Sequence, residues 1–353
     1  MPAEKHLIIG AGLTGLTLAK LLHQAGETAT IIEARDRIGG RILTKRSKGQ
    51  APIEMGATWL GKKHTALVQL LEDLGIPIFE QQLGTHAIYE PISTSPPQLV
   101  QLPPNDAPSY RIAGGTDRLI QTLYDGLPAE TVRPAEVLQK IEQQEEGLLV
   151  TTDQNQYLAQ HVISTLPPYL LVNSVAFSPA LPQDVMDVAQ STHTWMGDSI
   201  KVGLRFSQPF WRDQGKSGTI FSNVGPIPEM YDHANLEDDA FSLKGFLNGA
   251  YHAAGPEQRR KAVLQQLQRY YGDEILEQLN YEEKVWRQEP YTFREYTGYI
   301  LPHQNNGHAA YQQSYFNGRL FIAGSETAQQ FPGYMEGAVR SAQAVFQSLT
   351  TMD

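Results

Sequence analysis

The chain has 353 residues and no cysteine. This absence excludes disulfide bonds, a thiolate nucleophile and any metal site with cysteine ligands, and it suits a reducing compartment. No run of 18 apolar residues occurs, so no helix is expected to span a membrane. Basic side chains are outnumbered, with 28 Lys and Arg against 38 Asp and Glu, and the formal net charge is −10. Because nucleic-acid binders present a basic face, a nucleic-acid partner is not expected either.

The composition is that of a globular protein, with 41% hydrophobic and 19% charged residues. The length corresponds to two or three units of about 150 residues. An apolar stretch at residues 7–19 has the character of a signal-peptide core, but its spaced glycines and the regular pattern after it favour a folded element. We therefore expect a cytoplasmic protein.

A glycine-rich turn follows the first predicted strand, residues 6–9. The sequence Gly10-Ala11-Gly12-Leu13-Thr14-Gly15 leads directly into a helical pattern. This is the fingerprint of a dinucleotide-binding βαβ unit: the first glycine permits a tight turn, the second lets the backbone approach a pyrophosphate, and the third lets the helix pack closely on the strand. The helix N-terminus, with Leu13 and Thr14, then offers unpaired N–H groups to phosphate.

The next predicted strand, residues 28–33, ends in an acid, Glu33, which lies 18 residues after Gly15. A carboxylate at this place accepts hydrogen bonds from a ribose 2′-OH and repels a 2′-phosphate, which disfavours NADP. Arginines and glycines follow, and the candidate phosphate-binding residues among them are Ala34, Arg35, Gly40 and Arg41. Guanidinium groups and an approachable backbone suit a pyrophosphate contacted from a second side. Taken alone, this segment also fits a charged surface loop.

From this point the chain resembles the flavin-containing monoamine oxidase family, with its polyamine and L-amino-acid oxidase relatives. The resemblance runs through nearly the whole chain in the order of the family's motifs, which are EARDRIGGR (33–41), IEMGATWLG (53–61), GGTDRLIQTL (114–123), VISTLPP (162–168), MGDSIKVGLRFSQPFWR (196–212), YEEKVW (281–286) and LFIAGSETAQQFPGYMEGAVRSA (320–342). It implies an α/β fold (α+β overall), in which a Rossmann-like FAD-binding domain is interleaved with a mixed-sheet substrate domain.

The resemblance also implies a division of the chain. Residues 1–78, 111–180 and 293–353 are assigned to a discontinuous FAD-binding domain, and residues 79–110 and 181–292 to the substrate-binding domain. The proline-rich span 79–110 is predicted to be a loop-rich crossover rather than a folded unit. Because monoamine oxidases carry a larger helical insertion there, the wall of the substrate cavity is expected to be reduced.

Further cofactor-binding residues follow from the resemblance. They are Gly56, Ala57, Thr58 and Trp59 in a flavin-contacting loop, then Val137 and Trp286, and finally Gly324, Ser325, Glu326, Gly333, Tyr334, Met335 and Ala338 at the last predicted helix, residues 333–349. The N-terminus of that helix is expected to point at the pyrimidine end of the flavin, where its dipole stabilises the reduced state. Glu326 is alternatively a helix-capping acid.

Three residues are predicted to be catalytic, namely Lys201, Tyr296 and Tyr334. Alternation in the strand 199–206 alone places Lys201 on the exposed face, whereas the resemblance implies a desolvated lysine that holds a water against the flavin and assists oxygen reduction. The two tyrosines resemble the family's aromatic cage, which orients an amine and excludes water. Tyr299 or Phe293 is the alternative to Tyr296.

The expected cofactor is non-covalent FAD. Glu295 stands where the monoamine oxidases carry the cysteine that bonds the flavin, and the chain has no cysteine elsewhere. The ten histidines show no metal-ligand spacing, so no metal site is expected.

The resemblance therefore implies an FAD-dependent amine oxidase that moves a hydride from the amine α-carbon to flavin N5. Its products are an aldehyde and ammonia or an amine, and reoxidation by O₂ gives H₂O₂. The expected partners are a small-molecule amine and O₂, without nucleic acid or membrane. One alternative is a desaturase-like or renalase-like oxidoreductase acting on a C–C bond or a dihydronicotinamide. A second is a non-catalytic flavoprotein subunit. Neither the amine nor the oligomeric state follows from the sequence.

Overall fold

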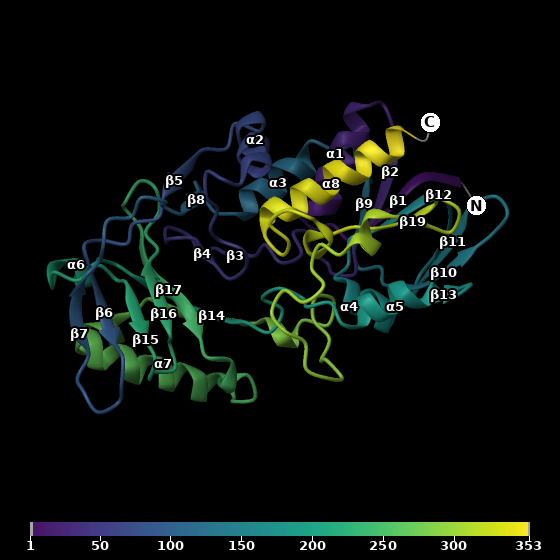
Figure 1. Ribbon diagram of the computed structural model, residues 1–353. Coiled ribbons are helices and arrows are strands. Elements are labelled where there is room, and N and C mark those ends of the chain that lie inside the picture. Colours follow the sequence, from purple (N-terminus) through teal and green to yellow (C-terminus); the bar gives the residue numbers. More distant parts are fainter. Residues whose placement is uncertain (1–2, 352–353) are drawn as a thin grey trace.

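Two large β-sheets, each covered by helices, make up the computed structural model, which describes residues 3–351 (Figure 1). The first strand (Ala3–Ile9) and the last helix (Met335–Thr350) both belong to the part of the molecule built on the first sheet (Figure 1). Residues 1–2 and 352–353, which belong to the expected FAD-binding segments, lie outside the described residues. None of the helices between residues 3 and 351 has the length and apolarity that crossing a bilayer requires.

The first sheet has nine strands and draws on both ends of the chain. Its strand order is β13-β10-β11-β12-β1-β2-β9, and the long strand β12 also pairs with β20, which pairs with β19. The strands are β1 (Ala3–Ile9), β2 (Ala29–Ile32), β9 (Val132–Arg133), β10 (Leu138–Gln143), β11 (Leu148–Thr152), β12 (Gln156–Ser164), β13 (Ala176–Ser178), β19 (Ser314–Tyr315) and β20 (Leu320–Ile322). β2, β1, β12 and β20 run parallel.

Helices cover both faces of this sheet, which explains why β1 ends in three consecutive apolar residues, Leu7–Ile9. Leu7 and Ile9 pack into one core and Ile8 into the other, as expected for a central parallel strand buried on two sides. On the Ile8 face lie α1 (Leu13–Gln24), α2 (Thr65–Asp73), α3 (Asp117–Asp125) and α8 (Met335–Thr350). On the opposite face lie α4 (Pro168–Ser174) and α5 (Gln183–Gln190).

The second sheet has seven strands in the order β18-β14-β17-β16-β15-β6-β7. The strands are β6 (His86–Glu90), β7 (Gln98–Gln101), β14 (Ile200–Phe206), β15 (Ile220–Ser222), β16 (Glu229–Asp232), β17 (Phe241–Leu247) and β18 (Asn280–Val285). Helix α7 (Pro256–Tyr271) packs Val263 and Leu267 against the apolar face of this sheet. The opposite face is turned toward the first sheet, and it carries polar side chains that matter below.

Short elements connect the two sheets. Two-stranded pairs are formed by β3 (Thr44–Lys45) with β4 (Ile53–Glu54), and by β5 (Ile78–Glu80) with β8 (Tyr110–Ile112). A short helix α6 (Phe210–Asp213) follows β14, and 3₁₀ turns occur at η1 (Gly249–Tyr251), η2 (Asp273–Glu277), η3 (Trp286–Gln288), η4 (Ala309–Gln312) and η5 (Ser325–Thr327).

The predicted α/β fold class is confirmed, but the prediction that residues 79–110 form a loop-rich crossover rather than part of a folded unit is wrong. This span supplies β6 and β7, which extend the edge of the second sheet. Its prolines delimit strands rather than preventing them: Pro91 follows β6, Pro97 precedes β7, and Pro108 precedes β8. Proline cannot donate to a strand ladder but is tolerated at strand ends and at sheet edges, so a high proline count did not exclude strands here.

Candidate active site

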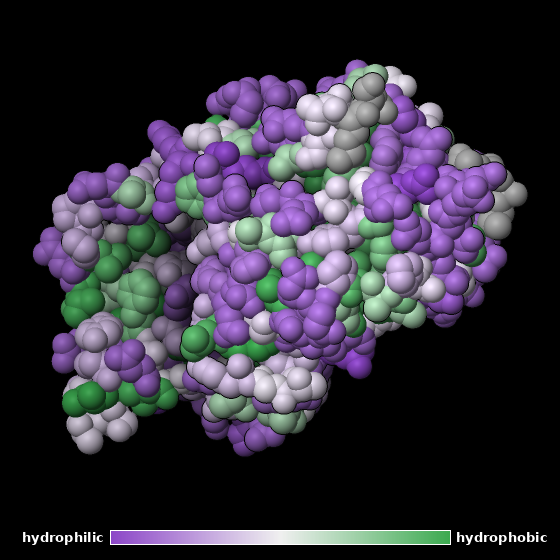
Figure 2. Space-filling view, turned by 45° about the vertical axis from the view of Figure 1, so that its right-hand side comes forward, coloured by the Kyte–Doolittle hydropathy of each residue, from purple (hydrophilic) through white to green (hydrophobic). Residues whose placement is uncertain are grey.

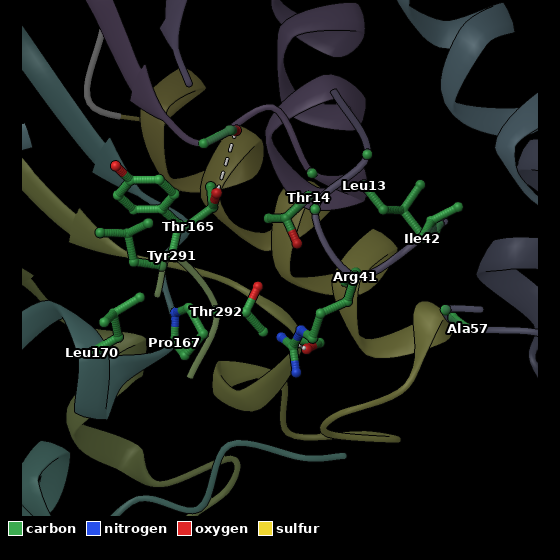
Figure 3. A pocket seen from close by; sticks show the side chains of 18 of the residues that line it. Leu13, Thr14, Arg41, Ile42, Ala57, Thr165, Pro167, Leu170, Tyr291 and Thr292 are labelled. Carbon is green, nitrogen blue, oxygen red and sulfur yellow. Dashed lines mark hydrogen bonds between the residues drawn. The ribbon is translucent and has the colours of Figure 1, made fainter. Parts of the chain in front are cut away.

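A cavity of about 450 Å³ is lined by residues from both sheets. Figure 3 shows Leu13, Ile42 and Ala57 on one side of it, and Pro167, Leu170 and Tyr291 on the other. At the surface, Figure 2 shows a hollow between the part that carries the second sheet, at the left, and the remainder of the molecule.

Most of the residues predicted to bind the cofactor lie in this lining. They are Gly10, Gly12, Leu13, Thr14, Glu33, Ala34, Arg35, Gly40, Arg41, Gly56, Ala57, Thr58, Trp59, Val137, Trp286, Ser325, Gly333, Tyr334, Met335 and Ala338. Gly15, Gly324 and Glu326 lie behind the lining. Of the predicted catalytic residues, Lys201 and Tyr334 line the cavity and Tyr296 is not part of its lining.

The glycine turn between β1 and α1 forms a close-packed cradle. Gly10 has a φ of 104°, which glycine adopts readily. A Cβ on Gly40 would lie 3.3 Å from the Cα of Gly12, so the two backbones nearly touch. A Cβ on Gly15 would overlap the carbonyl oxygen of Gly10. Gly15 is therefore needed for the packing of α1 on β1, as its place in the fingerprint predicts.

Glu33 connects this turn to the end of β2. Its carboxylate accepts hydrogen bonds from the backbone N–H groups of Ala11 (2.8 Å) and Arg35 (2.9 Å). The side chain is 4% exposed yet borders the cavity. An ionised carboxylate has about four acceptor positions, so Glu33 retains capacity for hydroxyl groups of a ligand.

Arg41 is held by a bidentate ion pair with Glu326. Its Nη1 lies 2.5 Å from Oε1 and its Nη2 lies 2.8 Å from Oε2, and Nη2 also donates to the Ser325 hydroxyl. Burial alone raises the pKa of Glu326, but the Arg41 guanidinium more than offsets this and the net pKa is lowered. Glu326 thus orients Arg41 toward the cavity, and the cap position of α8 belongs to Tyr334.

Two helix N-termini meet the same cavity. Helix α1 begins after Gly12 and α8 after Tyr334, and among the described residues no side chain caps either helix. Each terminus therefore presents free N–H groups and the positive end of a helix dipole. Together with the glycine cradle and Glu33, this donor set fits a pyrophosphate-linked dinucleotide with a ribose diol.

Beside Arg35 the structure places Glu289, Tyr291 and Thr292, which the sequence did not identify. Arg35 is fixed by Glu289, at 3.0 and 2.9 Å, and by the Thr292 hydroxyl. Thr292 lines the cavity beside Tyr291. Val137 also lines the cavity, but its N–H donates to the Asp153 carboxylate and its carbonyl accepts from the Asp153 N–H. Only the side chain of Val137 is therefore available for contact with a ligand.

Lys201 is buried in β14, contrary to the exposed position that alternation alone predicts. Its side chain is 5% exposed, and its Nζ donates to the Gly56 carbonyl. Burial lowers the pKa of Lys201 to about 8. The polar face of β14 is covered because Met55 and Ile53 pack on Gly203, where a Cβ would lie 2.5 Å from Ile53 Cγ2. Strand alternation cannot reveal such a second covering layer.

Trp59 and Trp286 form part of the wall near Lys201. The indole N–H of Trp286 donates to the Met55 carbonyl (2.7 Å), and that of Trp59 donates to Gln81 (3.1 Å). Both rings are thereby fixed in orientation. Phe246 of β17 lies beside them in the lining.

The aromatic group nearest Tyr334 is Trp195, a residue that the sequence did not single out. Their ring centroids are 5.8 Å apart, and His303 stacks on Trp195 at 3.9 Å. The Trp195 backbone accepts from Arg41 (3.1 Å) and donates to Glu326 (3.2 Å). The ion pair that faces the cavity thus also positions this indole.

Tyr296 lies outside the ring pair that was predicted for it. Its ring packs against Tyr169, His193 and Phe293, and its hydroxyl accepts from the Thr194 N–H at 2.9 Å. The neighbouring chain turns Tyr296 toward α4 and leaves Trp195 next to Tyr334. A tryptophan directly before the MGDSIK segment was the available sequence signal.

Comparisons with known proteins agree with this geometry. The model of the family described as flavin containing amine oxidoreductase matches residues 13–93 and 93–347. Human amine oxidase [flavin-containing] B is 25% identical, over 96% of this chain and 84% of its own. A putative flavin-containing monoamine oxidase, AofH, of Mycobacterium tuberculosis is 26% identical, over 96% and 94%.

Solved structures share the fold. A putrescine oxidase bound to putrescine superposes with a TM-score of 0.86 at 23% identity, covering 99% of both chains. Cyclohexylamine oxidase from Brevibacterium oxydans IH-35A gives a TM-score of 0.86 at 22% identity, covering 100% of both.

Proposed function

The chain belongs to the flavin-containing amine oxidoreductase family, and from this premise we propose that it oxidises a small-molecule amine with bound FAD and O₂. The observation that carries the proposal is one cavity that joins a dinucleotide-type lining to a buried lysine and to aromatic rings. When bound, FAD supplies the redox chemistry, taking the α-hydrogen of the amine as hydride and passing two electrons to O₂ to give H₂O₂. The resulting imine is hydrolysed to an aldehyde and ammonia or an amine.

The adenosine and pyrophosphate parts of FAD are assigned to the first-sheet end of the cavity. Glu33 is positioned to accept from a ribose diol, and the uncapped end of α1 and Arg41 are positioned to bind phosphate oxygens. The cofactor is held without a cysteinyl bond because the chain has no cysteine. Heat-denatured protein should therefore release FAD into the supernatant.

The substrate end is assigned to Tyr334, Trp195 and Phe246. These rings offer apolar faces against which a neutral amine packs and is oriented, and Tyr334, which is 41% exposed, is accessible to such a ligand. Lys201 borders the same end and holds a proton at Nζ close to neutral pH, since its pKa is lowered to about 8. A cation there stabilises the negative charge that develops when O₂ is reduced.

The experiment that tests this function is an anaerobic titration of the purified protein, followed in the visible spectrum. Amines and amino acids are added in turn, with NADH and NADPH as controls. Bleaching of oxidised flavin by an amine, with recovery in air and formation of H₂O₂, is the expected result. Bleaching by a nicotinamide alone would contradict the proposal and favour a renalase-like activity. Bound flavin that no donor reduces would also contradict it.

Lys201→Met provides a more specific prediction. The variant should bind FAD but lose the cation at the cavity wall, and reoxidation by O₂ should slow by about tenfold or more. Stopped-flow spectroscopy of the reductive and oxidative half-reactions measures this. Lys216→Met is a matched control, because Lys216 is a partly buried lysine bonded to Gln214 and Tyr270, away from the cavity lining. Unchanged rates in both half-reactions would eliminate the role of Lys201.

A further inference from the structure

A second buried lysine, Lys244, lies beside Lys201 on the polar face of the second sheet. Lys201 of β14 pairs with Phe246 of β17, and Gly203 pairs with Lys244. The two lysines are therefore diagonal neighbours on one face, within reach of each other across the strands. Lys244 is fully buried at 0% exposure, whereas Lys201 borders the cavity.

The two amines share the same surroundings. Their Nζ atoms lie 5.9 Å (Lys201) and 3.7 Å (Lys244) from the Trp59 ring centroid, and 5.1 and 5.0 Å from that of Phe246. Each amine also contacts one neutral acceptor, and both lie over the same two rings on one face of the sheet. The acceptors are the Gly56 carbonyl for Lys201, and the Thr58 hydroxyl at 3.0 Å for Lys244.

Carboxylates act on this pair only through space. Glu54 and Glu229 favour the charged forms of both lysines, but the Glu54 oxygens are already engaged by the Thr116 N–H and the Thr44 hydroxyl. The remaining titratable or charged groups facing the pair from the surrounding elements are Tyr231, His233, Arg111, Arg205, Glu282 and Lys284. Arg205 is itself occupied by Glu282 and by backbone carbonyls.

Two ammonium groups cannot hydrogen-bond to each other, because each has only donors. Two ammonium groups would also repel each other over the same two rings, where no carboxylate among the described residues is in hydrogen-bond contact with either, whereas a neutral amine can offer its lone pair to the neighbouring ammonium. Lys244 is the more deeply buried, and it bears the larger penalty for charge. We propose that Lys244 is a positioning residue that stays neutral and accepts a hydrogen bond from the Lys201 ammonium, so that the pair carries one proton and presents it at the cavity wall.

This arrangement gives Lys244 an effect on a cavity that it does not line. The Lys244 lone pair stabilises the charged form of Lys201 and so counteracts the burial that lowers the pKa of Lys201. Without that acceptor, Lys201 should lose its proton at a lower pH. The inference rests on the proposed function in that it takes FAD to be the occupant of the cavity.

The test compares two uncharged replacements of Lys244 that both remove its amine. Lys244→Met removes the acceptor, whereas the amide oxygen of Lys244→Gln retains one. The holoenzyme is titrated without substrate from about pH 6 to about pH 10, and the visible spectrum of bound FAD reports the charge of Lys201. Lys201→Met, which lacks the reporting group, and Lys216→Met are the controls.

Wild type and Lys244→Gln should show a spectral transition near pH 8. In Lys244→Met the midpoint should fall by about one pH unit, a tenfold loss of proton affinity. Lys201→Met should show no transition, and Lys216→Met should match wild type. The pH profile of flavin reoxidation should shift with the spectrum.

If the midpoint is the same in wild type, Lys244→Met and Lys244→Gln, then Lys244 has no effect on the proton of Lys201 and serves only in packing. This result would overturn the proposal. A wild-type spectrum without a transition in this range would overturn the proposal as well. If Lys244→Met does not retain FAD, Lys244→Arg replaces it: a permanent cation should lower the midpoint even further, and an unchanged midpoint contradicts the proposal. None of these readings needs an amine substrate, so failure of the proposed oxidase activity is recognised separately.

Discussion

At the scale of single residues, the proposed substrate end of the cavity depends on which aromatic side chain lies beside Tyr334. The structure assigns this position to Trp195, whose ring centroid is 5.8 Å from that of Tyr334. Tyr296 packs instead against Tyr169 at 4.8 Å. Substitutions of Trp195 and of Tyr296 are therefore expected to affect KM differently.

Trp195→Ala should raise KM for the best amine by about tenfold, because an aromatic contact with an amine contributes about 1–2 kcal/mol. Trp195→Phe should have an intermediate effect. FAD affinity should change little, since Arg41 and Glu326 contact only the Trp195 backbone. Steady-state kinetics and FAD titration measure both quantities. Tyr296→Phe is the comparison, and a larger rise in KM for that variant than for Trp195→Ala would contradict the assignment.

A site residue could be predicted when nearby residues in the sequence indicate its role, and not when its role depends on contacts with distant residues. Glu33 could be identified because it terminates a strand at a set distance from the glycine turn. Lys244 could not, because its relation to Lys201 arises from the pairing of β14 with β17, 43 residues further along the chain. A single lysine inside the apolar segment 241–247 was the signal that remained.

At the scale of elements, Gly203 determines how closely β4 and Met55 approach β14. A Cβ at this position would lie 2.5 Å from Ile53 Cγ2, 3.0 Å from Ile53 Cδ1 and 3.1 Å from Met55 Cε. Gly56, whose carbonyl accepts from Lys201, follows Met55 directly. An added methyl group at Gly203 should therefore displace the loop of residues 56–59, which is predicted to contact the flavin.

Gly203→Ala should therefore lower the free energy of unfolding by about 1–3 kcal/mol and should weaken FAD binding. Gly249→Ala is the matched control, because a Cβ there meets no atom within 4 Å. Denaturant unfolding and FAD titration of both variants measure the two effects. If Gly203→Ala were as stable as the control and bound FAD equally well, the proposed coupling of β4 to the cavity would be refuted.

The elements themselves were largely predictable where hydrophobic periodicity was regular. The predicted strand 199–206 begins one residue before β14, and the predicted helix 333–349 overlaps α8 along nearly its whole length. The failures have a common cause. β6 and β7 form strands because they pair at the edge of the second sheet, although prolines flank them. Lys201 is buried because a second layer of residues covers its face of β14. In both cases tertiary contacts, which the local sequence pattern does not show, determine the structure.

At the scale of the whole molecule, the burial of two lysines has a cost in stability that depends on pH. In the unfolded chain Lys201 titrates near 10.5, and in the folded chain its pKa is about 8. Below about pH 8 the folded protein therefore bears a penalty of about 3 kcal/mol for the charged amine. Burial also lowers the pKa of Lys244, which acts in the same direction.

The direction in which the free energy of unfolding changes with pH follows from the number of protons bound on unfolding. Between the folded and unfolded pKa values of Lys201, the unfolded chain binds more protons, so the free energy of unfolding rises with pH. Buried tyrosines such as Tyr271 and Tyr311 act oppositely at higher pH, because burial raises the pKa of each and the folded chain retains their protons. Maximum stability of the apoprotein is therefore expected on the alkaline side of neutrality.

Urea unfolding of the apoprotein at about pH 7 and about pH 9.5 should show this rise, to which Lys201 alone contributes about 2 kcal/mol. The double variant Lys201→Met, Lys244→Met should be more stable than wild type at about pH 7, because it buries no lysine, and its stability should depend less on pH. The difference between the two proteins isolates the lysines from the other titrating groups. If wild type and double variant had the same pH dependence, the two amines would have to be solvated in the folded protein, and the paired arrangement at the cavity wall would fail with them.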